Sequence, residues 1–101
     1  MVSKATRDAV MEGVQVREGE YIGFERGRII CSCSTRNEAA LKAAEALGMQ
    51  LHEVALLFFG EDTPAEEAQA LATELGTRFP RTETMLTDGG QPVYDYLIVL
   101  C

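Results

Sequence analysis

Apolar and polar residues alternate along the first third of the chain, and glycines stand where the alternation breaks. Ile22 and Phe24 fall on one face of a strand, and a second strand follows over 28–31. The Arg-Gly dipeptide at 26–27 predicts a tight turn between them, because glycine adopts the positive φ that such a turn needs. These residues are therefore predicted to form a β-hairpin.

The residues before this hairpin have the same strand pattern. Residues 2–10 are predicted to be a strand that leads through Glu12-Gly13 into a short strand over 14–16. A helical turn over 5–11 is the alternative. Because the sequence begins inside a strand, we expect a domain excised from a longer protein.

The spacing of apolar residues becomes helical after Thr35. Thr35 and Glu38 predict a capping box, in which the hydroxyl accepts a hydrogen bond from the amide three residues on and the carboxylate reaches back. Gly48 stands where a left-handed C-terminal cap is needed. The apolar stripe between them consists of Ala40, Ala44 and Leu47.

A buried strand and a second helix follow. Residues 54–59 are apolar at every position, which predicts a central strand covered by helices on both faces. After it, Thr63 is the predicted N-cap, Pro64 the first helical residue and Glu66 the partner of Thr63 in a second capping box. The inner stripe of this helix is predicted to be Ala68, Leu71, Ala72 and Leu75.

The last part of the chain is predicted to contain a strand over 82–87, a loop over 88–92 and a strand over 94–100. Alternation of strands and helices is typical of parallel pairing with right-handed crossovers. We therefore expect one α/β domain over residues 1–101. Its N-terminal β-hairpin or meander is followed by β-α-β-α-β, with a mostly parallel sheet flanked by helices.

Composition excludes several classes of protein. The chain has 101 residues, of which 47% are hydrophobic, so it can bury a core and is not intrinsically disordered. Its formal net charge of −7 opposes binding to nucleic acid and to anionic membrane surfaces. No apolar run is long enough to be a transmembrane segment, and the start of the sequence lacks the apolar stretch of a secretory signal. We expect a cytoplasmic protein.

Polar loops follow two strands that are predicted to be neighbours, and ligands tend to bind beyond the carboxyl ends of such strands. The candidate residues that face a partner or ligand are Gly60, Glu61, Asp62, Thr63, Asp88, Gly89, Gly90, Gln91, Pro92 and Tyr94. Acidic residues at the start of the second helix oppose the binding of a bare anion. These acidic residues are compatible with stabilising the dipole of the second helix. They are also compatible with binding a hydroxyl-bearing ligand, a magnesium ion or a basic residue of a partner.

We expect no catalytic residue and no metal site in this chain. Cys31 and Cys33 share one face of a strand and are predicted to be small buried thiols. Together with Cys101 and His52 they could supply four zinc ligands, but their scattered spacing argues against a zinc site. An acid and base pair formed by Glu61 and Asp62 is disfavoured, because adjacent side chains point in different directions.

The order of the short motifs resembles one known family. The motifs are Ala-Thr-Arg-Asp at 5–8, Glu-Gly at 12–13, Arg-Glu-Gly-Glu-Tyr-Ile-Gly at 17–23, Gly-Arg-Ile-Ile at 27–30, Phe-Gly-Glu-Asp at 59–62 and Gly-Gly-Gln-Pro-Val-Tyr at 89–94. Together they resemble the C-terminal domain of the A component of the bacterial fatty-acid kinase family, also described as dihydroxyacetone-kinase-like. The resemblance extends over residues 2–100.

The resemblance implies a larger parent protein with an ATP and magnesium domain and a middle domain before this one. It also implies a separate fatty-acid-binding subunit, whose acyl carboxylate the parent phosphorylates and which the C-terminal portion engages. This chain has no counterpart of the magnesium loop. It is therefore expected to bind no cofactor and to be no kinase alone, whereas the parent is expected to be an ATP-dependent kinase.

Two hypotheses follow. In the first, the chain is a non-catalytic docking domain that presents residues 60–63 and 89–94 to a partner, with Tyr94 and Tyr96 as amphipathic anchors. Gln91 then positions the loop without performing chemistry. In the second, Glu61, Asp62, Asp88 and Gln91 contribute to a small-molecule phosphotransfer site that another domain completes.

Overall fold

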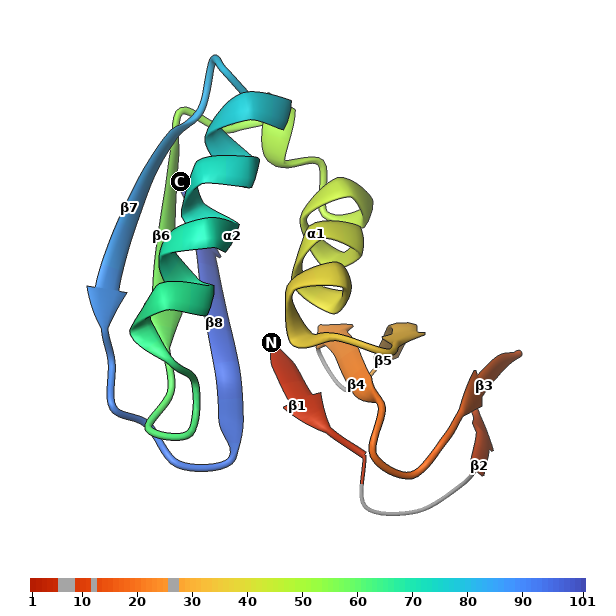
Figure 1. Ribbon diagram of the computed structural model, residues 1–101. Helices are drawn as coiled ribbons and strands as arrows, with labels where there is room; N and C mark the ends of the chain where they lie inside the picture. The colour runs from red at the N-terminus through yellow and green to blue at the C-terminus, as the bar shows by residue number, and fades with distance from the viewer. Residues whose placement is uncertain (6–8, 12, 26–27) are drawn as a thin grey trace.

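The computed structural model describes residues 1–5, 9–11, 13–25 and 28–101. Its centre is a six-stranded sheet in the order β5-β4-β1-β8-β6-β7, and a separate hairpin consists of β2 and β3 (Figure 1). The strands are β1 (Val2–Lys4), β2 (Ala9–Met11), β3 (Val14–Val16), β4 (Tyr21–Glu25), β5 (Arg28–Cys33), β6 (Val54–Phe59), β7 (Glu83–Asp88) and β8 (Tyr94–Leu100). The helices are α1 (Arg36–Ala46), the short 3-10 helix η1 (Met49–Leu51) and α2 (Ala65–Arg78).

The prediction of a mostly parallel sheet was wrong. Among the strands of the described residues, only β6 and β7 pair in parallel, whereas β1 pairs antiparallel with both β4 and β8, and β8 pairs antiparallel with β6. The helical crossover through α2 does join parallel neighbours, as expected. The connection through α1 does not, because β1 and β8, from the two ends of the chain, lie between β5 and β6. The fold is a mixed, largely antiparallel sheet with two helices.

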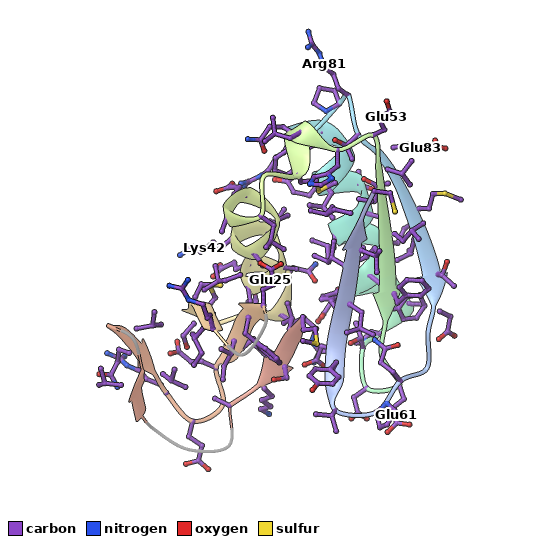
Figure 2. The ribbon with its side chains drawn as sticks, turned by 180° about the vertical axis from the view of Figure 1, so that it is seen from behind. Glu25, Lys42, Glu53, Glu61, Arg81 and Glu83 are labelled. Atoms are coloured by element: carbon purple, nitrogen blue, oxygen red, sulfur yellow. The ribbon has the colours of Figure 1, made fainter. Side chains whose placement is uncertain are left out.

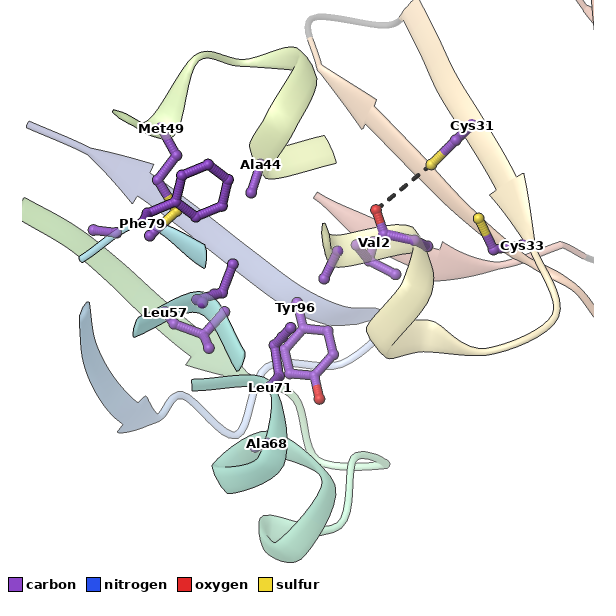
Figure 3. Packing of buried hydrophobic residues seen from close by; sticks show 14 residues of the cluster. Val2, Cys31, Cys33, Ala44, Met49, Leu57, Ala68, Leu71, Phe79 and Tyr96 are labelled. Atoms are coloured by element: carbon purple, nitrogen blue, oxygen red, sulfur yellow. Dashed lines mark hydrogen bonds between the residues drawn. The ribbon is translucent and has the colours of Figure 1, made fainter. Parts of the chain in front are cut away.

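Both helices pack on one face of this sheet and share one core (Figure 3). The largest fully buried side chains come from all along the chain, from Val2 on β1 to Tyr96 on β8. Ala68, Leu71 and Leu75 of the predicted stripe of α2 are buried, and Ala72 is partly buried against the same cluster. In α1 the buried stripe is Ala39, Ala40, Ala43 and Ala44, while Leu47 caps the helix.

Strand β6 is therefore covered on one face only, which corrects the prediction of helices on both sides. Ala55 and Leu57 face the helices and are buried, while the alternate residues Val54, Leu56 and Phe58 are half-buried on the other face. Seen from behind, this face of β6 and its neighbours carries no helix from the described part of the chain, and α2 lies on the far side (Figure 2). An apolar run signals burial but does not say what covers each side.

The ends of α1 follow the predicted chemistry. The Thr35 hydroxyl accepts a hydrogen bond from the Glu38 amide at 3.2 Å, and Gly48 adopts a left-handed φ of 69° just beyond the helix. The second half of the predicted capping box differs, because the Glu38 carboxylate accepts a hydrogen bond from the Ser34 hydroxyl. The local signals thus located this helix correctly.

The capping box predicted at the start of α2 was wrong. Pro64 is the N-cap, without a side-chain hydrogen bond, and Thr63 turns away from the helix. The Thr63 hydroxyl instead donates to the backbone carbonyl of Asp95 at 3.0 Å. A tertiary contact to β8 therefore uses the group that local spacing assigns to the helix.

The N-terminal prediction was correct in part. Residues 9–11 and 14–16 pair as an antiparallel hairpin, but the expected strand over 2–10 is described as two separate strands, β1 and β2. Glu12 and the predicted turn at 26–27 lie outside the described residues. In the described part of the chain, no helix has the length and apolar character needed to cross a membrane.

Candidate functional site

The loops after β6 and β7 meet at one end of the sheet. The Glu61 amide donates to the carbonyl of Gln91 at 3.0 Å, and the Gly60 amide donates to the carbonyl of Asp95 at 2.9 Å. We call this surface, made of residues 60–63 and 88–94, the loop edge. Glu61 marks its position in Figure 2, at the opposite end of the sheet from Glu53 and Glu83.

Gly60 and Gln91 hold the two loops together. A Cβ atom at Gly60 would collide with the backbone carbonyl oxygens of Tyr94 and Gln91, so the close approach of the loops requires glycine. The side-chain amide of Gln91 donates to the carbonyls of Phe58 at 3.3 Å and Tyr94 at 3.2 Å. Gln91 is thus a structural brace of the loop edge.

The tip of the second loop presents an apolar side chain in a strained conformation. The amides of Gly89 and Gly90 both donate to the carbonyl of Phe59, which fixes the start of the loop. Val93 then has a φ of 72° and is 75% exposed. A β-branched residue rarely adopts a positive φ, and such strain persists only where the surroundings impose it. The loop edge therefore holds Val93 out toward solvent.

The predicted site residues fall into three groups by exposure. Facing solvent are Glu61, Asp62, Asp88, Gly89, Gly90 and Pro92. Gln91 and Tyr94 are half-buried, and Tyr94 packs its ring against Phe24 with the ring centroids 5.8 Å apart. Gly60 and Thr63 are buried. We call the exposed carboxylates Glu61, Asp62 and Asp88 the acidic rim.

Behind the loop edge lies a cluster around Arg36 that sequence reasoning missed. Arg36 Nη1 donates to the carbonyl of Asp62 at 2.9 Å, and its Nη2 donates to the Tyr21 hydroxyl at 3.0 Å. The Arg36 guanidinium also lies over the Tyr21 ring and forms an ion pair with Glu67 at 3.3 Å. Arg36 thereby ties α1, β4 and the first loop together.

Asp95 completes this cluster from β8. Its carboxylate lies 3.7 Å from Arg36 Nη1 and accepts a hydrogen bond from the Thr63 hydroxyl at 3.4 Å. Burial raises the pKa of Asp95, and this desolvation outweighs the opposing effects of Arg36 and Thr63. Burial by itself would lower the pKa of Arg36, but the hydrogen bond to Tyr21 and the charge of Asp95 raise it overall.

Sequence signals for these residues were present. Asp95 stands between two tyrosines at the start of an otherwise apolar strand, and such an interruption suggests a buried polar contact. Arg36 and Asn37 follow the N-cap of α1 directly, where the partners come from distant segments. Only the tertiary arrangement identifies those partners.

Tyr96 is not the interface anchor that the sequence suggested. Its side chain is fully buried in the core, and its hydroxyl donates to Asn37 Oδ1 at 2.6 Å. Asn37 in turn donates from its amide to the carbonyl of Glu67 at 3.0 Å. Tyr96 therefore connects β8 to α1, and only Tyr94 of the two tyrosines reaches the loop edge.

The thiols lie in the core, as predicted. Cys31 and Cys33 are buried, and the Cys31 thiol donates to the carbonyl of Ala39 at 3.5 Å (Figure 3). Burial, together with the neighbouring Cys31, raises the pKa of Cys33 to about 11, so little reactive thiolate forms near neutral pH. Cys101 is exposed, and His52 precedes β6 at the end opposite the loop edge.

The described residues contain no group of three or more His, Cys, Asp or Glu side chains that could hold a metal ion. At the loop edge, the side-chain amide of Gln91 and the hydroxyl of Thr63 are engaged in internal hydrogen bonds. What faces solvent is a braced set of backbone turns with carboxylates and one apolar tip. Such a surface is suited to contact with another molecule.

Comparison with known proteins places this chain among larger proteins. It is 27% identical over 97 residues to Protein YloV of Bacillus subtilis, and this alignment covers 96% of the present chain and 18% of Protein YloV. It is 26% identical over 96 residues to an uncharacterized protein of Staphylococcus haemolyticus, with 95% of this chain and 17% of that protein covered. The chain thus spans less than a fifth of the length of these relatives.

A family match extends over almost the whole chain. The family is described as FakA-like, the C-terminal domain of proteins similar to the A component of fatty acid kinase, and it matches residues 1–100. This agrees with the motifs over residues 2–100 that suggested the same family. The chain belongs to this FakA-like C-terminal family of the fatty acid kinases.

Proposed function

We propose that this domain is a non-catalytic docking module of a fatty-acid-kinase-like protein. Its loop edge engages a fatty-acid-binding subunit, so that an ATP and magnesium domain elsewhere in the parent phosphorylates the bound acyl group. A cytoplasmic location of the parent is part of this proposal. Family membership supports the kinase context, and the shape of the loop edge supports the docking role.

The observation that carries the docking role is the presentation of Val93. This side chain is held at positive φ with 75% exposure, at the tip of a loop braced by Gln91. An ordered loop loses little conformational entropy when it binds, so it favours recognition of a partner. Val93 supplies an apolar contact, and Tyr94 beside it supplies a half-buried ring.

The acidic rim supplies the electrostatic part of the interface. Glu61, Asp62 and Asp88 are exposed on the same loop edge as Val93, on a chain with a net charge of −7. Charged groups around an apolar contact accelerate association with an oppositely charged surface and select against wrong partners. We therefore expect a basic patch on the fatty-acid-binding subunit where it meets the loop edge.

The phosphotransfer alternative is less well supported by the geometry. It needs Gln91 to reach a ligand, but the Gln91 amide already donates to the carbonyls of Phe58 and Tyr94. It also places three carboxylates where a nucleotide carries phosphates, which like charges oppose in the absence of metal. Isothermal titration of this chain with magnesium-ATP distinguishes the two, because specific binding would favour the alternative.

The docking role is tested by charge reversal on the full-length parent. Glu61→Lys together with Asp62→Lys reverses the acidic rim, and both side chains are exposed, so the fold should be retained. The matched control is Glu53→Lys with Glu83→Lys, an exposed pair at the opposite end of the sheet with the same change in charge (Figure 2). Association with the fatty-acid-binding subunit is measured by surface plasmon resonance.

We expect the first pair of substitutions to slow association and weaken binding at least tenfold, while the control pair changes binding by less than about threefold. Val93→Ser should weaken binding through a faster dissociation. Equal effects of the two pairs would show that only overall charge matters. Unchanged binding by both the reversed rim and Val93→Ser would exclude the loop edge as the docking surface.

A further inference from the structure

Strand β1 is shorter than the two strands that it joins. It spans Val2–Lys4, whereas β4 spans Tyr21–Glu25 and β8 spans Tyr94–Leu100. Its hydrogen-bond ladder with β4 extends to Met1. The Met1 amino group donates to the carbonyl of Phe24 at 3.0 Å, and the Phe24 amide donates to the carbonyl of Met1 at 2.9 Å.

The second half of β8 has backbone groups directed toward the place that a longer β1 would occupy. Cys101 exchanges hydrogen bonds with Val54 next to β6, and the Asp95 carbonyl accepts from Gly60 on the same side. Because backbone groups alternate sides along a strand, Tyr96, Ile98 and Leu100 direct theirs away from β6. Tyr96 is the pairing partner of Val2, and no described residue is paired with Ile98 or Leu100 on that side.

A pocket lies at the same place. It has a volume of about 270 Å³ and is lined by Glu25, Leu47, His52, Ile98 and Leu100. Leu47, Ile98 and Leu100 form its apolar part, and Glu25 and His52 form its polar part. Figure 1 shows the N-terminus between β8 and β4. We call this pocket, together with the adjoining backbone of Ile98 and Leu100, the strand slot.

We propose that the strand slot is a binding site for an extended segment that continues β1 upstream of Met1 in a longer chain. The relatives of this chain are long enough to supply such a segment, since it covers only 18% of Protein YloV. An extended segment satisfies the free backbone groups of β8 and fills the pocket in a single step, as in strand addition to a sheet edge. This inference does not depend on the docking role of the loop edge.

The register of β1 dictates the chemistry of the segment. Val2 pairs with Tyr96 and is fully buried on the helix-covered face. Continuing the ladder, the first residue upstream of Met1 pairs with Ile98, and the third pairs with Leu100. Their side chains lie on the helix-covered face against Ile98 and Leu100, which pack against the core, and should therefore be apolar. The side chain of the second lies on the uncovered face and can be polar.

The proposal is tested with the 101-residue chain carrying three added residues before Met1. The extension Val-Thr-Val places valine at the first and third positions, and the matched control Asp-Thr-Asp has the same length but would place carboxylates in the pocket beside Glu25. Amide hydrogen exchange is measured by NMR for both and for the unextended chain. The Val99 amide, directed toward β6, is the internal reference.

With Val-Thr-Val we expect the amides of Ile98 and Leu100 to exchange at least tenfold more slowly, relative to Val99, than in the unextended chain. With Asp-Thr-Asp they should exchange at the rate of the unextended chain. Unchanged exchange with Val-Thr-Val would overturn the proposal. Equal slowing by both extensions would contradict the predicted apolar register.

Discussion

The Tyr96 hydroxyl offers a sharp test of how β8 is joined to α1. The substitution Tyr96→Phe keeps the fully buried ring and removes only the hydroxyl that donates to Asn37 Oδ1 at 2.6 Å. A neutral hydrogen bond contributes about 0.5–1.5 kcal/mol to stability, and leaving a partner unsatisfied adds to the loss. Because Asn37 is only half-buried and water can replace part of the bond, we expect a loss of about 1–2 kcal/mol.

The assay is urea denaturation followed by circular dichroism, in which the free energy of unfolding is extrapolated to water. In a thermal scan, each kcal/mol corresponds to a decrease in Tm of about 4–8 °C for a domain of this size. The matched control is Tyr94→Phe. The Tyr94 ring packs against Phe24, and among the described residues no hydrogen bond is formed by the Tyr94 hydroxyl.

Tyr94→Phe should change the free energy of unfolding by less than about 0.5 kcal/mol. A double-mutant cycle of Tyr96→Phe with Asn37→Ala should give a coupling energy of about 0.5–1.5 kcal/mol. If Tyr96→Phe is as stable as the unchanged protein, or if the cycle shows no coupling, the hydrogen bond between β8 and α1 does not stabilise the fold.

Three further predictions concern other parts of the fold. Gly60→Ala should lower the free energy of unfolding by about 1–3 kcal/mol or more, because its Cβ meets the carbonyls of the adjoining loop, whereas Gly76→Ala on the open side of α2 should raise it by about 0.5–1 kcal/mol. Urea denaturation measures both variants, and equal effects would contradict the packing argument. Burial lowers the pKa of the Met1 amino group from its ordinary value of 8.0, so the unfolded chain binds this proton more tightly, and the free energy of unfolding should rise as the pH increases through the lowered pKa toward 8. N-terminal acetylation should remove this pH dependence in urea titrations, and a dependence that persists would assign it to another group. Iodoacetamide at pH 8 should label the exposed Cys101 well before the buried Cys33, whose pKa is raised to about 11. Mass spectrometry measures the two labelling rates, and equal rates would refute the buried position of Cys33.

Local chemistry was sufficient to predict the elements whose signals lie within a few residues. Thr35 and Gly48 mark the two ends of α1, because an N-cap hydroxyl and a left-handed glycine each act on the helix next to them. The turn residues around Gly60 and Gly89 likewise indicated two loops, and the order of motifs identified the family. The loops could be placed together because the carboxyl ends of β6 and β7 meet when those strands are parallel.

Only the tertiary structure decided the order of the strands and the partners of the buried polar groups. Strand β1 enters the middle of the sheet because Val2 and Tyr96, far apart in the sequence, bury each other on one face, and no local pattern encodes that pairing. Thr63 illustrates the same point, since its hydroxyl could cap α2 but is used by Asp95 across the fold. Short-range patterns determine whether a segment is a helix or a strand, whereas its neighbours depend on which apolar faces and polar groups are satisfied together in the folded state.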